Sequence, residues 1–368
     1  MDIEAASDTS SRSFKQTVRE GLATAGLLPL AQRARWWSKA GAAIVTGRRG
    51  AANFAANQLA YERGHVRIPM PPVHITIEPA NICDMECPVC ETGAGIMQRP
   101  RGYMSLENFK RIVDGVASHT NTLFFYFMGE PFLNKHWYEM LRYAKAQGIP
   151  FINTCTNGHF VDPEQVVRSG IDEISFQIGG VTQATHEVYR INGDLERSLA
   201  NCRETVLAKK RLGAGSPRVA LGFIVMKHNE HEVPAFHRLA KDLGVDEATV
   251  IDPCVRTVYQ GKQYLPSNTV NWFYNREEFE QHQTLVPKEL SDGCPWIYHS
   301  LVVCWNGDIV PCCRDPQGKF VMGNLLDHDL ETIWNGEPYV RFRERLLTEQ
   351  GTVSICKLCS SYPPPDLH

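Results

Sequence analysis

The feature that most constrains the fold is an alternation of short β-rich runs with amphipathic helical segments between residues 73 and 256. Turn residues bound each of the six β-rich runs, which read VHITIEPA, TLFFYFMGEP, PFINTC, EISFQIGG, RVALGFIVM and ATVIDPCV. Between the first two runs, Phe109, Ile112 and Val116 share one helical face, and Ser105 is placed to cap that helix. Strands separated by helices form a parallel sheet with right-handed crossovers. We therefore expect an α/β fold, a partial (β/α)6 TIM-like barrel with its functional groups at the carboxyl ends of the strands.

This alternation divides the chain into three predicted parts. Residues 1–72 predict an N-terminal helical segment, residues 73–258 the barrel, and residues 259–368 a linker followed by a small cysteine-rich domain. The segment from Arg12 to Arg49 contains eight Lys or Arg residues but only one acidic residue, Glu20. A helical cap packed on the barrel is the simpler interpretation, and the alternative is peripheral membrane contact through residues 12–49.

Charge and hydropathy exclude several classes of protein. The net charge of -3 gives no reason to expect a polyanionic partner such as a nucleic acid for the whole molecule. No apolar run is long enough to span a bilayer, and the opening MDIEAASDTSSRS does not resemble a secretory leader, so we expect a cytoplasmic protein. In that reducing compartment, twelve cysteines indicate metal ligation or redox chemistry rather than disulfides.

Three of these cysteines, Cys83, Cys87 and Cys90, lie together directly after the first predicted strand. Three thiolates can hold three irons of a [4Fe–4S] cluster and leave the fourth iron open for chemistry. A zinc site is the alternative, but zinc knuckles pair two ligands with two more nearby, and no Cys or His follows until His119. The spacing therefore favours a catalytic iron–sulfur cluster.

With this loop in this position, residues 73–256 resemble the radical S-adenosylmethionine (SAM) superfamily. The resemblance implies that the reduced cluster cleaves SAM to a 5′-deoxyadenosyl radical, which abstracts hydrogen from the substrate. Met128, Gly129, Glu130 and Pro131 resemble the Gly-Gly-Glu turn that receives the amino group of SAM, with Met128 in place of the first glycine. Glu130 is then the expected partner of the SAM ammonium group.

The same resemblance implies further SAM contacts on the next two strands. Thr156 and Asn157 close the third strand, and Ser175 and Gln177 lie on the fourth, where the family places groups that bond the ribose. Many relatives carry an acid at the position of Gln177 or in the following turn, where this chain has two glycines.

A second cysteine set consists of Cys294, Cys312, Cys356 and Cys359. Four thiols complete a [4Fe–4S] cluster with no open iron. The segment resembles the auxiliary-cluster extension called SPASM or, in its shorter form, twitch. The full form uses seven cysteines, and SSYPPPDLH after Cys359 contains none, so we expect one auxiliary cluster. The alternative is a zinc ribbon, which uses two CxxC pairs, whereas this segment has one.

Four of the remaining cysteines have distinct expected roles. Cys202 lies on an apolar helical face and Cys304 on a hairpin strand, so both are expected to be buried in the core. Cys254 ends the sixth predicted strand and Cys313 adjoins a cluster ligand. Either of these last two is a candidate hydrogen-atom donor to a substrate radical.

The resemblance leaves the reaction open between modifiers of ribosomal peptides and dehydrogenases or epimerases of sugars and aminocyclitols. Peptide modifiers commonly carry a winged-helix domain with strands, and residues 1–72 lack any period-two run. We therefore expect a small or lipid-linked hydroxylated substrate, net oxidation through the auxiliary cluster, and a reductant such as flavodoxin or ferredoxin. The alternatives are a redox-neutral epimerase with a cysteine donor, a peptide maturase and a non-enzymatic iron–sulfur protein.

Overall fold

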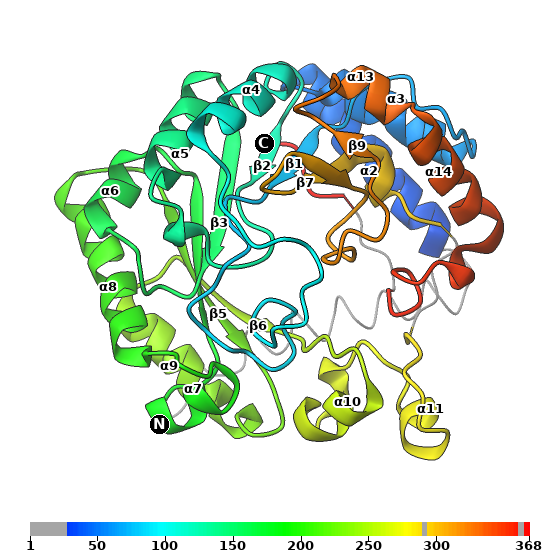
Figure 1. Cartoon of the computed structure of the whole chain (residues 1–368). Helices are drawn as coiled ribbons and strands as arrows, with labels where there is room; N and C mark the ends of the chain where they lie inside the picture. Colours follow the sequence, from blue (N-terminus) through cyan, green and yellow to red (C-terminus); the bar gives the residue numbers. More distant parts are fainter. Residues whose placement is uncertain (1–27, 289–292, 360–363) are drawn as a thin grey trace.

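The computed structural model of the chain describes residues 28–288, 293–359 and 364–368, drawn in colour in Figure 1. Its described part contains one nine-stranded sheet with the order β6-β5-β4-β3-β2-β1-β7-β8-β9. The strands are β1 His74–Ile77, β2 Thr122–Phe124, β3 Phe151–Thr156, β4 Glu173–Ile178, β5 Arg218–Ile224, β6 Glu247–Ile251, β7 Ser300–Val303, β8 Asp308–Val310 and β9 Gly323–Asn324.

Strands β1 to β6 are parallel neighbours in chain order, which confirms the expected partial barrel. The crossover helices lie along the outside of the curved sheet (Figure 1). They are α4 Leu106–Val116, α5 Trp137–Ala146, α6 Pro163–Arg168, α7 Gln183–Tyr189, α8 Leu195–Arg211 and α9 Val233–Leu243. Helix α4 begins as predicted, because the Ser105 side chain accepts a hydrogen bond from the Asn108 backbone N–H.

The two faces of the sheet differ in polarity: one is apolar and covered by helices, and the other carries polar side chains. Side chains such as Ile152 and Ile174 are fully buried against the helices. Their strand neighbours Cys155, Ser175 and Gln177 point to the opposite, concave face and are only partly buried. The concave face therefore offers polar groups to a ligand.

The C-terminal segment continues the same sheet. Strand β7 pairs in parallel with β1, and β8 and β9 add antiparallel strands beyond it. Gly307 has a φ of 90° in the turn between β7 and β8, which confirms the predicted hairpin. The remaining helices are α10 Val258–Tyr264, α11 Arg276–Gln281, α12 Trp296–His299, α13 Leu330–Trp334 and α14 Glu337–Glu349.

Two N-terminal helices, α2 Leu28–Val45 and α3 Ala51–Glu62, confirm helical structure in this segment. Helix α3 covers the amino ends of β1 and β7, where the Phe54 ring lies 4.3 Å from the ring of His299. Residues 1–27 and the Trp36 side chain lie outside the described part. No helix among the described residues is long and apolar enough to cross a bilayer.

Candidate functional site

The first cysteine set lies on the loop that leaves the carboxyl end of β1. The Cys83 sulfur accepts a hydrogen bond from the Met85 backbone N–H at 3.5 Å, and the Cys90 N–H donates to the Cys87 carbonyl at 3.1 Å. Burial raises the pKa of Cys83 to about 12, and Cys87 raises it further. Burial also raises the pKa of Cys87, with a contribution from Cys90. The three side chains therefore face one another, and without iron Cys83 and Cys87 are protonated.

Arg190, which directly follows α7, brings a buried positive charge to this loop. Burial disfavours its charge, but Cys87, Tyr189, Cys90 and Cys83 together raise its pKa. The Arg190 Nε atom has no hydrogen-bond partner within the described residues. A guanidinium here can bind an anionic group beside the three thiols. Sequence reasoning missed Arg190, since nothing in its local motif separates it from a surface arginine.

The expected Gly-Glu turn packs directly on the cysteine loop. Gly129 has a φ of +77°, and a Cβ there would lie 2.6 Å from the Ile82 carbonyl oxygen, so only glycine fits. The next residue, Glu130, donates its backbone N–H to the same carbonyl at 2.8 Å. The turn at Gly129 and Glu130 therefore packs on the cysteine loop even though Met128 stands where the family has a glycine.

The Glu130 carboxylate is 2% exposed, and burial raises its pKa to about 7. Its oxygens accept hydrogen bonds from Thr156 Oγ1 and from the Asn157 backbone N–H, each at 2.8 Å. Thr156 and Asn157, expected near the ribose, therefore hold the carboxylate in place. A buried carboxylate with an elevated pKa gains free energy from a cationic partner such as an ammonium group.

A second network ties the cysteine loop to β3. Asp84 accepts a hydrogen bond from Asn157 Nδ2 at 2.7 Å and pairs with His159 Nδ1 at 2.6 Å. Burial disfavours the Asp84 charge, but the bonds from His159 and Asn157 lower its pKa overall. Sequence reasoning missed this pair, because residues 84 and 159 meet only when β1 and β3 are assembled.

Ser175 and Gln177 lie on the concave face of β4, and Gln177 Nε2 donates to Ser175 Oγ at 2.7 Å. The turn that follows has no room for an acidic side chain. A Cβ on Gly180 would lie 2.4 Å from the His186 backbone nitrogen in α7. The glycines at this point let α7 pack close to the end of β4.

The four C-terminal cysteines also come together in space. Burial raises the pKa of Cys294 to about 12, and the neighbouring Cys359 raises it further. Burial also raises the pKa of Cys356 to about 12, with further contributions from Cys294 and Cys359. Burial also raises the pKa of Cys312, and the neighbouring thiols Cys313, Cys294 and Cys356 raise it further. No three His, Cys, Asp or Glu side chains in the described ranges are grouped tightly enough to hold one metal ion. A [4Fe–4S] cluster, whose irons and sulfides separate its thiolates, is compatible with the spacing of both cysteine sets.

The two candidate donor thiols lie near this auxiliary set. Arg314 Nη1 donates to Cys254 Sγ at 2.7 Å, so the loop after β8 reaches the end of β6. Cys313 keeps contact with solvent but is surrounded by protein atoms, and this burial raises its pKa. Cys202 and Cys304 are fully buried, as predicted.

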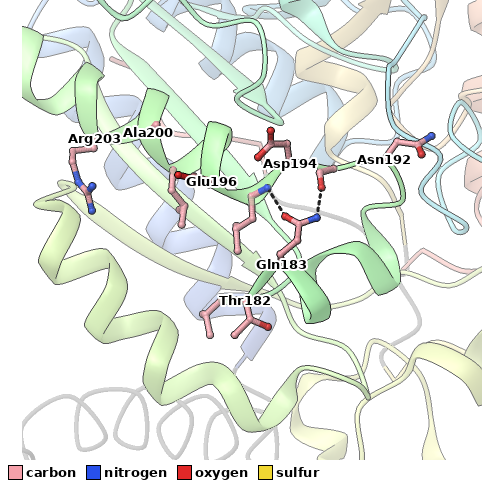
Figure 2. A pocket seen from close by; sticks show the side chains of 11 residues that line it. Thr182, Gln183, Asn192, Asp194, Glu196, Ala200 and Arg203 are labelled. Carbon is pink, nitrogen blue, oxygen red and sulfur yellow. Dashed lines mark hydrogen bonds between the residues drawn. The ribbon is translucent and has the colours of Figure 1, made fainter.

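A separate pocket lies beside helices α7 and α8 (Figure 2). It has a volume of about 620 Å³ and is lined by residues 181–183 at the start of α7, by the turn between α7 and α8, and by the first half of α8. Gln183 spans it, donating to the Gly193 carbonyl and accepting from the Leu195 N–H (Figure 2). None of the predicted site residues lines this pocket.

Comparison with known proteins identifies the two cysteine-bearing regions. Residues 77–240 match the Radical SAM superfamily, and residues 294–360 match SPASM, described as an iron–sulfur cluster-binding domain. The AdoMet-dependent heme synthase of Methanosarcina barkeri is 31% identical over 326 residues, 76% of this chain and 87% of that protein.

A second sequence relative and a solved structure also match most of the chain. The tungsten-containing aldehyde ferredoxin oxidoreductase cofactor-modifying protein of Pyrococcus furiosus is 23% identical over 78% of this chain and 87% of its own. The crystal structure of Streptococcus suis SuiB bound to S-adenosylmethionine has a TM-score of 0.58 at 14% identity and covers 84% of this chain and 76% of that chain. At that identity, the likeness shows a common fold.

Proposed function

This chain belongs to the radical SAM superfamily and contains a SPASM domain, and from that premise we propose that it oxidises a small hydroxylated substrate. The substrate class is a sugar, an aminocyclitol or a lipid-linked alcohol. Membership implies SAM, a [4Fe–4S] cluster and additional iron–sulfur chemistry in the SPASM domain. We also propose the division into residues 1–72, 73–258 and 259–368 as three functional parts.

The cofactors have distinct proposed ligands. Cys83, Cys87 and Cys90 hold the first cluster, and Cys294, Cys312, Cys356 and Cys359 hold the auxiliary cluster. When bound, these groups supply a 5′-deoxyadenosyl radical from SAM and a one-electron acceptor.

The residues of the chain bind and orient SAM. Glu130 binds its ammonium group, which the burial of that carboxylate supports. Arg190 is placed to bind its carboxylate beside the thiols. Ser175 and Gln177 bond the ribose from the concave face, and Thr156 and Asn157 act by holding Glu130.

The observation that carries net oxidation is the convergence of all four auxiliary cysteines. Four protein thiolates saturate a cubane, which leaves no iron for the substrate to bind. Accepting an electron is the remaining role for such a cluster near the substrate. An alcohol radical that loses one electron and one proton becomes a ketone.

A tetrapyrrole substrate is a second candidate. The observation that favours it is the 31% identity to a heme synthase over 87% of that protein. The two candidate substrates differ in the group from which hydrogen is abstracted. The hydroxylated substrate offers a C–H bond beside a hydroxyl, whereas the tetrapyrrole offers a side chain of the porphyrin.

Deuterium transfer tests both candidates. Reconstituted, reduced protein is incubated with SAM and either carbon-deuterated alcohols or a deuterated carboxylated iron porphyrin. We expect deuterium in 5′-deoxyadenosine from one alcohol class and a product two hydrogens lighter. Transfer from the porphyrin alone would replace our first proposal with the second.

A further inference from the structure

Cys254 lies at a junction between the two cysteine-bearing loops. It follows the carboxyl end of β6, and its sulfur accepts from Arg314, two residues after the auxiliary ligand Cys312. On its other side, Arg256 binds Glu91, the neighbour of Cys90 in the first loop, at 2.5 Å. A chain of contacts therefore runs from one cluster loop to the other through Cys254.

Two guanidinium groups donate to the Cys254 sulfur. Arg314 Nη1 lies at 2.7 Å and Arg256 Nη1 at 3.8 Å. The Tyr274 hydroxyl lies 3.7 Å from the sulfur, but its single O–H donates to the Val255 carbonyl at 2.5 Å. A neutral thiol is a weak acceptor, whereas a thiolate satisfies two converging guanidinium donors.

The charges around Cys254 support the same protonation state. Glu91 pairs with Arg256, and Arg314 faces the sulfur directly at this junction. Burial disfavours the charged sulfur, but Arg314 and Arg256 outweigh it and the pKa of Cys254 is lowered. Tyr274 and Cys313 are titratable groups nearby, and burial raises the pKa of each, so both stay neutral at pH 7.

Other cysteines provide an internal contrast. Burial raises the pKa of Cys155 and Cys202 to about 12, and neither has two guanidinium groups within reach in the described structure. Cys254 is therefore distinguished by its neighbours rather than by its exposure.

We propose that Cys254 is held as a thiolate and is the proton acceptor for the substrate hydroxyl, not a hydrogen-atom donor. This inference rests on the proposed oxidation. After hydrogen abstraction, the substrate carbon carries an unpaired electron beside its O–H group. The O–H proton passes to Cys254 Sγ and forms S–H, one electron passes to the oxidised auxiliary [4Fe–4S] cluster, and the carbon–oxygen double bond forms. A thiolate has no S–H hydrogen to return, so the sequence-based donor role does not apply to Cys254 in this state.

Alkylation kinetics test the protonation state without any substrate. Full-length protein with both clusters reconstituted is treated anaerobically with iodoacetamide between pH 5.5 and 9.5, and modification of the Cys254 peptide is followed by mass spectrometry. We expect the rate at pH 7 to be at least about ten-fold higher than in Arg314→Gln, which corresponds to about one pKa unit. Arg314→Lys should restore most of the rate, because it keeps the charge.

The controls separate this effect from misfolding and from the proposed function. Arg276→Gln removes an exposed arginine of α11 that pairs with Glu280, and it should leave the Cys254 profile unchanged. Iron content should be equal in all variants. A midpoint at or above that of an ordinary thiol, or no modification at any pH, would overturn the proposal, since a substrate must also reach this sulfur. A failed oxidation with a confirmed thiolate would instead contradict the proposed function.

Discussion

Glu78 and Arg99 form a two-point ion pair, with Arg99 Nη1 2.8 Å from Glu78 Oε2 and Nη2 2.7 Å from Oε1. Glu78 follows β1 and is fully buried, and Arg99 lies on the loop after the first cysteine set. The same carboxylate accepts from the Trp305 backbone N–H at 3.1 Å, and Arg99 Nε donates to the Pro316 carbonyl at 2.7 Å. This pair therefore joins the barrel to the hairpin and loop of the SPASM segment.

Replacing Arg99 by Gln should destabilise the protein by about 3–5 kcal/mol, because it leaves a buried carboxylate without its cationic partner. Urea unfolding of the reconstituted protein under anaerobic conditions measures the change. The double variant Glu78→Gln with Arg99→Gln should recover much of the loss, since no buried charge then remains. Equal losses in the single and double variants would show that Arg99 acts through packing alone.

Glu130→Gln should weaken SAM binding by roughly ten- to a hundred-fold, as a charge-assisted bond contributes about 1.5–3 kcal/mol. Equilibrium binding to the reconstituted enzyme measures it, with iron content as a check. Glu139→Gln, on the exposed face of α5, is the matched control. Unchanged affinity in Glu130→Gln would remove this residue from the SAM site.

Binding of SAM should also depend on pH through Glu130. Burial raises the pKa of this carboxyl from 4.5 to about 7, so without SAM the folded protein holds it protonated below pH 7. An ammonium group needs the carboxylate, and affinity should therefore fall as the pH drops from 8 to 6. Glu130→Gln should lose this dependence. A flat profile in the wild type would contradict the assignment.

Anaerobically reconstituted protein should contain about eight irons, from two cubanes of four. Joint replacement of Cys83, Cys87 and Cys90 by Ala should leave about four irons and abolish SAM cleavage. Cys202→Ala, a buried core thiol, should retain the full iron content. Zinc with negligible iron in natively purified protein would contradict both cluster assignments.

The product distinguishes oxidation from epimerisation. We expect a ketone or similar product two hydrogens lighter than the substrate, with no deuterium taken up at carbon from heavy water. Cys254→Ser should still form 5′-deoxyadenosine but lose product at least about ten-fold, and Cys254→Asp should restore part of it as an anionic acceptor. Retained mass with one solvent deuterium, abolished in Cys313→Ala, would instead establish an epimerase.

The alternative to a helical cap is contact of the N-terminal segment with anionic membranes, which rests on the cationic residues 12–49 and on Ile44 and Val45, exposed at the end of α2. We expect co-sedimentation with phosphatidylserine vesicles at low salt and its loss in Val45→Asp. Val270→Asp, exposed elsewhere on the molecule, is the control. Protein that stays in the supernatant would favour the helical cap.

The order of strands and helices along the chain and the grouping of the cysteines into two sets followed from the sequence alone. Hydrophobic periodicity and ligand spacing are local properties, so the runs from VHITIEPA to ATVIDPCV predicted β1 to β6. The three-cysteine loop and the Gly129–Glu130 turn were recognisable for the same reason. The hairpin whose strand carries Cys304 was likewise expected from the local sequence.

Only the tertiary structure decided which charges surround these motifs. Arg190 reaches Cys87 because α7 packs against the end of β4, and Arg314 reaches Cys254 because the loop after β8 meets the segment after β6. The contacts of the Glu78–Arg99 pair with Trp305 and Pro316 likewise need the barrel and the hairpin in one sheet. Such contacts join residues as distant in the sequence as Cys87 and Arg190, and their strength depends on burial. Neither the distance between two distant residues nor their exclusion from water is encoded in any local pattern.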